Sequence, residues 1–91
     1  MTPSELRERM EGPSPPAVLD VRTHAEWSQG HLPGSIHVPL DELPARLETL
    51  DRESETVVVC AHGVRSAHAV NYLRSAGFSR VRNLRGGLAA W

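Results

Sequence analysis

Short apolar runs alternate with segments of helical periodicity along the chain. Four runs have the length and composition of strands: Ala17–Asp20, Ser35–Val38, Thr56–Cys60 and Arg80–Leu84. The third run is apolar and β-branched almost throughout, which is typical of a central strand covered on both faces. Strands that alternate with helices predict an α/β fold, in which a mostly parallel central sheet is flanked by helices on both faces.

The first helix is predicted from its end signals. Thr2 is a suitable N-cap, Pro3 occupies the first helical position, and Glu5 completes a capping box. The glycine- and proline-rich segment Gly12–Pro16 then ends the helix. Too little chain precedes this segment to form a domain, so we interpret it as a connection to the first strand.

Two further helices are predicted between the later strands. Asp41 is expected to cap a helix that carries three apolar residues on one face, namely Leu43, Leu47 and Leu50. The last helix is expected to run from about Arg65 to Ala76, with Gly77 after its end. Its inner face is predicted to consist of Ala69, Val70 and Leu73.

Length and charge narrow the class of protein. Ninety-one residues, 40% of them hydrophobic, are enough for one packed core, so residues 1–91 are predicted to form a single domain. The net charge is -1 without a basic run, so no nucleic-acid partner is expected. No apolar stretch resembles a signal peptide or a membrane span, so we expect no membrane contact and a cytoplasmic location.

The only cysteine of the chain, Cys60, lies at a position that favours chemistry. A lone cysteine excludes an internal disulfide and a cysteine-based zinc site. Cys60 ends the strand that the apolar pattern predicts to be most buried, and it precedes a short loop with Gly63, which leads into the last helix. Ligands of α/β sheets bind at the carboxyl ends of the strands, where a tight turn directs backbone N–H groups at an anion. The loop is therefore expected to favour the thiolate.

Four segments together resemble the rhodanese-like sulfurtransferases. They are C-x-x-G-x-R-S at Cys60–Ser66, D-V-R-x-x-x-E at Asp20–Glu26, G-H-L-P-G-S-I-x-x-P at Gly30–Pro39 and N-L-x-G-G-x-x-x-W at Asn83–Trp91. They follow one another in the family's order from about residue 17 to residue 91. Any one of these matches alone is weak, whereas the set is specific.

The resemblance implies a covalent sulfur relay without a metal or organic cofactor. Cys60 would take the sulfane sulfur of a small anionic donor such as thiosulfate, or of a protein persulfide, and pass it to cyanide or a thiol. The backbone N–H groups of the loop would form the cradle for this sulfur, which assigns substrate binding to Ala61, His62, Gly63, Val64, Arg65 and Ser66.

The side chains of the site receive provisional roles. Arg65 is expected to brace the loop through its guanidinium, with binding of an anionic donor as the second interpretation. Ser66 can cap the helix and donate to the loop, and His62 can shape the entrance. Asp20 and Arg22 leave the first strand on the ligand side as supporting residues, and an ion pair between Arg22 and Glu26 is predicted.

Three alternatives stay open at this stage. A non-catalytic binding module of the same fold is opposed by the presence of Cys60, which such modules typically lose. A related cysteine phosphatase is opposed by the loop, because four residues separate Cys60 from Arg65 and phosphatases have one more. A third alternative keeps the persulfide but makes the protein a sulfur carrier between other proteins, in cofactor sulfuration or sulfide oxidation.

Overall fold

The computed structural model describes residues 1–91 and contains one sheet of four parallel strands. The strands are β1 (Ala17–Asp20), β2 (Ile36–His37), β3 (Thr56–Val59) and β4 (Val81–Asn83). Their order across the sheet is β2-β1-β3-β4, so β3 lies in the interior as its apolar run predicted. Because all four strands are parallel, their carboxyl ends meet at one edge of the sheet.

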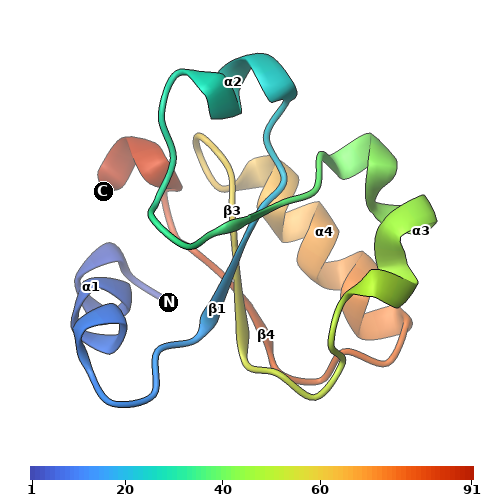
Figure 1. Ribbon diagram of the computed structural model, residues 1–91, viewed down its shortest axis with the longest axis horizontal. Coiled ribbons are helices and arrows are strands. Elements are labelled where there is room, and N and C mark those ends of the chain that lie inside the picture. The colour runs from blue at the N-terminus through green and yellow to red at the C-terminus, as the bar shows by residue number, and fades with distance from the viewer.

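Helices cover both faces of this sheet, which confirms the predicted α/β class. Figure 1 shows α1 and the C-terminal turn η3 on one face, α3 and α4 on the other, and α2 beyond the carboxyl ends of the strands. The α-helices are α1 (Pro3–Glu11), α2 (His24–Ser28), α3 (Leu43–Arg46) and α4 (Val64–Ser75). The 3-10 turns are η1 (Leu40–Glu42), η2 (Leu47–Thr49) and η3 (Leu88–Ala90).

The interior strand β3 divides the apolar core into two clusters. Successive side chains of a strand point to opposite faces. Val57 and Val59 therefore pack in the cluster that contains Leu6 of α1, whereas Val58 and Cys60 join the larger cluster with α4. Cys60 is only 1% exposed. The cysteine is thus part of the packing beneath α4 as well as the first residue of the loop.

Local sequence signals predicted the first and last helices to within one residue of their observed ends. The Thr2 hydroxyl accepts from the Glu5 N–H (3.2 Å), and the Glu5 carboxylate accepts from the Thr2 N–H (3.2 Å), so the capping box is present. Helix α4 begins at Val64 and ends at Ser75, one residue earlier at each end than predicted. Strand β2 has only two residues, which is half of the predicted run.

The second predicted helix was wrong in its continuity and in its cap. The segment forms η1, α3 and η2 in succession, and Asp41 makes no capping hydrogen bond. Proline at position 44 has no N–H to donate and suits only the first turn of a helix. Leu43 is buried, and Leu47 and Leu50 pack at the margin of the larger core cluster. The apolar spacing therefore indicated the buried face correctly but not one helix.

None of the helices combines the length and the apolar character needed to cross a membrane.

Candidate active site

Cys60 directly follows β3, and the loop after it turns the chain back so that its N–H groups face the sulfur. The Cys60 Sγ accepts from the Gly63 N–H (3.1 Å) and from the Ser66 N–H (3.3 Å), and it lies 3.3 Å from the Ser66 hydroxyl oxygen. Gly63 is the N-cap of α4 and Ser66 lies in its first turn. The amides at the helix N-terminus are therefore directed at the sulfur atom.

This environment determines the ionisation of the Cys60 thiol. Burial raises its pKa, but hydrogen bonds from the Ser66 hydroxyl and N–H, and from the Gly63 and His62 amides, lower it. The net effect is a pKa below the ordinary value of 9.0. The direction agrees with the sequence-based expectation, and it means that more of the thiol is present as thiolate, the reactive form, at neutral pH.

Gly63 lets the loop pack closely against the segment after β4. Gly63 has φ +93°, and a Cβ there would lie 3.3 Å from the Gly86 nitrogen and 3.4 Å from the Leu84 oxygen. Gly63 was expected in this loop from the sequence, whereas its contact with Gly86 was not predicted. In the sequence, Gly86 and Gly87 stand out only as part of the N-L-x-G-G-x-x-x-W segment.

The C-terminal turn η3 holds the other side of the loop through the backbone. The Leu88 N–H donates to the Cys60 carbonyl (2.8 Å), and the Ala89 N–H donates to the Ala61 carbonyl (2.9 Å). We refer to these two hydrogen bonds as the η3 clamp. They connect the loop to residues that lie far along the chain, and no local sequence signal indicated them.

Arg65 braces the loop against α2, in line with the preferred interpretation of its role. Its guanidinium donates two hydrogen bonds to the Glu26 carboxylate, at 2.6 and 2.8 Å. The bonds from Arg65, with further ones from Thr23, lower the pKa of Glu26 to about 2. Glu26 also completes the capping box of α2 with Thr23, so one carboxylate fixes both the short helix and the loop.

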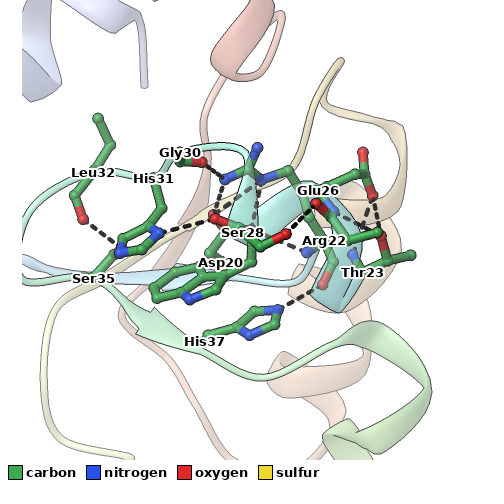
Figure 2. A network of polar contacts seen from close by, with 12 residues as sticks. Asp20, Arg22, Thr23, Glu26, Ser28, Gly30, His31, Leu32, Ser35 and His37 are labelled. Carbon is green, nitrogen blue, oxygen red and sulfur yellow. Dashed lines mark hydrogen bonds and ion pairs between the residues drawn. The ribbon is translucent and has the colours of Figure 1, made fainter.

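The predicted ion pair between Arg22 and Glu26 was wrong. Figure 2 shows that Arg22 instead contacts Asp20 and Gly30. Its Nη2 lies 2.8 Å from Asp20 Oδ2 and donates to the Gly30 carbonyl at 2.8 Å, and its backbone N–H donates to Asp20 Oδ1 at 3.0 Å. The reason is proximity. Asp20 lies only two residues before Arg22 at the end of β1, so its carboxylate is within reach of the guanidinium. The turn of α2 directs Glu26 to Arg65 instead.

Asp20 and Arg22 pair with each other at the end of β1 and are buried. Asp20 is fully buried and Arg22 is buried, so neither presents a charge to solvent. Beside them, the Trp27 ring is stacked between the imidazoles of His31 and His37, with ring centroids 3.5 and 4.5 Å apart. This stack, which sequence reasoning missed, fixes the segment that carries Glu26.

The remaining loop side chains point outward. His62 and Val64 are exposed and Ala61 is half-buried, whereas Gly63 and Ser66 are buried. A pocket of about 380 Å³ opens beside Arg65, and its lining is Val21, Thr23, Pro39, Leu40, Asp41 and Arg65. No group of three or more histidine, cysteine or acidic side chains is placed to share a metal ion. The predicted site residues thus lie together, with Asp20 and Arg22 behind them.

The Arg65–Glu26 pair makes stability depend on pH. Because the folded-state pKa of Glu26 lies below its ordinary 4.5, the pair stabilises the fold above pH 4.5, and this contribution is lost as pH falls towards about 2. We expect Glu26→Gln to lower the free energy of unfolding at neutral pH and to differ less from the unmodified protein as pH falls. Urea unfolding across this pH range measures the difference.

Glu11→Gln is the matched control, because Glu11 is exposed and forms no ion pair. This variant is expected to unfold like the unmodified protein at every pH. A Glu26→Gln deficit that is constant with pH would contradict the assigned role of the pair.

Comparison with known proteins decides the family. The sequence profile described as Rhodanese-like domain matches residues 2–91. The chain belongs to the rhodanese-like domain family. The putative sulfurtransferase YtwF of Bacillus subtilis is 36% identical over 86 residues, which cover 94% of this chain and 82% of that protein. The thiosulfate sulfurtransferase GlpE of Pseudomonas fluorescens is 42% identical over 74 residues, or 81% of this chain and 68% of that protein.

The solved structures agree with this assignment. A rhodanese-like domain protein from Staphylococcus aureus superimposes with a TM-score of 0.95 at 35% identity, over 100% of this chain and 88% of that one. The fold of this rhodanese-like domain and the predicted family are therefore confirmed. The names of its relatives support rhodanese-type sulfur transfer as the general chemistry.

Proposed function

We propose that this rhodanese-like domain is a sulfurtransferase in which Cys60 carries the transferred sulfur as a persulfide. The observation that carries the proposal is the arrangement of donors around one sulfur atom. The N–H groups of Gly63 and Ser66 lie 3.1 and 3.3 Å from Sγ at the N-terminus of α4. Such donors stabilise the attacking thiolate and any charge that remains on sulfur after transfer.

In the first half-reaction, the Cys60 thiolate attacks the outer sulfur of the donor. A new S–S bond forms, and the bond between that sulfur and the rest of the donor breaks. The electron pair of the broken bond leaves with sulfite when the donor is thiosulfate, or with a thiolate when the donor is a persulfide. Because Cys60 is buried, the donor has to present its outer sulfur end-on at the loop.

In the second half-reaction, cyanide or a thiolate attacks the outer sulfur of the Cys60 persulfide. The S–S bond breaks, the Cys60 thiolate is restored, and the acceptor leaves as thiocyanate or as a new persulfide. Each half-reaction is a displacement at sulfur, so no external oxidant, reductant or cofactor is required. Donor and acceptor can each be a small molecule or a protein, and the relative GlpE is named for the thiosulfate reaction.

The N–H groups of the loop, rather than its side chains, supply the anion cradle in this mechanism. Arg65 acts mainly as a brace, because both of its terminal nitrogens donate to Glu26. Asp20 and Arg22 hold the end of β1 beneath the site. Residues 1–91 would act as one domain in the cytoplasm, with a small anionic sulfur donor as the first candidate partner.

Sulfur loading tests the proposal directly. The protein is incubated with thiosulfate, with polysulfide, or with a cysteine desulfurase and cysteine, and its intact mass is measured. We expect a gain of one sulfur atom that cyanide removes and that Cys60→Ser abolishes. Absence of this adduct with all three donors would overturn the proposal, and Cys60-dependent hydrolysis of an aryl phosphate would support a phosphatase instead.

A further inference from the structure

Asn83, the half-buried last residue of β4, contacts the loop through its side chain. Its amide nitrogen donates to the Gly63 carbonyl (3.1 Å), and its amide oxygen accepts from the Ser66 hydroxyl. Because the Gly63 carbonyl can only accept, the nitrogen of the amide must face it. The amide oxygen is therefore directed at Ser66, and it can only accept there.

The hydroxyl of Ser66 consequently has two acceptors and one proton. Its oxygen is bonded to Asn83 and also lies 3.3 Å from the Cys60 sulfur. Ser66 is fully buried, so water does not supply a further donor from solvent. While its proton is directed at Asn83, the hydroxyl presents only lone pairs to the sulfur.

The Ser66–Asn83 hydrogen bond by itself favours the neutral thiol, and it works against the loop amides, which favour the thiolate and keep the pKa of Cys60 below its ordinary value. The S–H of Cys60 can donate to the Ser66 oxygen, which donates in turn to Asn83, so every group is paired. When Cys60 ionises, an oxygen lone pair faces an anion unless the Ser66 proton rotates to the sulfur. That rotation takes the donor away from the amide oxygen of Asn83, a half-buried residue, and the loss of this hydrogen bond costs free energy.

We propose that Asn83 is a positioning residue that competes with the Cys60 thiolate for the proton of Ser66. Formation of the persulfide moves negative charge from Sγ to the outer sulfur, so the proton is free to return to Asn83. Asn83 therefore favours the thiol and the loaded states over the empty thiolate. The inference rests on Cys60 being the nucleophile proposed above, but its test reads ionisation and needs no sulfur transfer.

The test is the pH midpoint of Cys60 ionisation, followed by ultraviolet absorbance of the thiolate and by the rate of alkylation. Cys60 is the only cysteine, so alkylation reports on this group alone, and subtracting the absorbance of Cys60→Ser removes the contribution of Tyr72 to the ultraviolet signal. Asn83→Leu removes the competing acceptor, and we expect the midpoint to fall by about one pH unit. Ser66→Ala is expected to raise it, because the thiolate loses a donor.

The double variant separates competition through Ser66 from a general change in the loop. In the Ser66→Ala background, Asn83→Leu is expected to leave the midpoint unchanged. A midpoint that does not fall in Asn83→Leu, or an equal fall in both backgrounds, would overturn the proposal. Asn71→Leu is the control, because Asn71 is exposed on α4 and is expected to leave the midpoint unchanged.

A second variant applies if Asn83→Leu does not unfold cooperatively in circular dichroism. Asn83→Asp places a stronger acceptor beside Ser66 and is expected to raise the midpoint, by more when Ser66 is present than in Ser66→Ala. Equal rises in both backgrounds would show direct repulsion only and would overturn the inference. Failure of sulfur loading in the unmodified protein would instead overturn the proposed function, and it leaves these midpoints measurable.

Discussion

Replacing Gly87 by alanine is expected to slow sulfur loading of Cys60 at least about 100-fold and to destabilise the fold by about 2–4 kcal/mol. Gly87 has φ +66°, and a Cβ there would lie 2.5 Å from the Ala61 oxygen and 2.6 Å from the Cys60 oxygen. The same two carbonyl oxygens accept the hydrogen bonds of the η3 clamp, Cys60 at 2.8 Å and Ala61 at 2.9 Å. The added methyl group therefore forces the loop and the turn apart, and the nucleophile is displaced.

Gly34→Ala is the matched control for this prediction. Gly34 also has positive φ (+76°), but no atom lies within 4 Å of a Cβ at that position. Gly34→Ala should lower the free energy of unfolding by about 1 kcal/mol because of backbone strain, and it should leave the rate of sulfur loading unchanged. Urea unfolding and the time course of intact mass measure the two effects. Equal behaviour of the two variants would show that backbone strain, and not collision with the loop, determines the result.

The second large effect is expected from Asp20→Ala, at about 3–5 kcal/mol of destabilisation. Asp20 is fully buried and pairs with Arg22, which is 9% exposed. Loss of the carboxylate leaves a buried guanidinium without its counter-charge, and an unpaired buried charge is costly. The total stability of a small domain is about 5–15 kcal/mol. Urea unfolding should therefore show a protein close to the limit of folding.

An exposed pair provides the comparison for Asp20→Ala. The side chain of Glu48 is 82% exposed and pairs with Arg52 four residues along the chain, so Glu48→Ala should have little effect on the free energy of unfolding. Removing both buried partners, in Asp20→Ala with Arg22→Met, should restore part of the lost stability. If Asp20→Ala costs no more than Glu48→Ala, the buried pair does not support the site.

The sequence predicted the parts of the fold that depend on local pattern. The apolar run at 56–60 identified the interior strand because burial on both faces requires apolar residues at every position. Caps identified α1, and Gly63 and Gly77 bracketed α4. The segment 40–49 was wrongly predicted as one continuous helix. Its apolar spacing indicates only which face is buried, whereas Pro44 has no N–H to continue a helix.

The partners of the site side chains could not be predicted, because they depend on how distant segments meet. From the sequence, Glu26 could pair with either Arg22 or Arg65. Only the turn of α2 in the structure assigns Glu26 to Arg65. Asn83 was recognised as one letter of a motif, and its contact with Ser66 follows from the position of β4 next to β3. The sequence indicated Cys60 as the candidate nucleophile, but it did not indicate the side chains that influence the ionisation of this thiol.

The η3 clamp also has a consequence for the order in which the site is completed during synthesis. A chain is made from its N-terminus, so the Cys60 loop emerges before Leu88 and Ala89. Until those two residues are added, the carbonyls of Cys60 and Ala61 lack their donors and the loop is free to sample other conformations. The candidate nucleophile therefore reaches its final geometry only when η3 is in place.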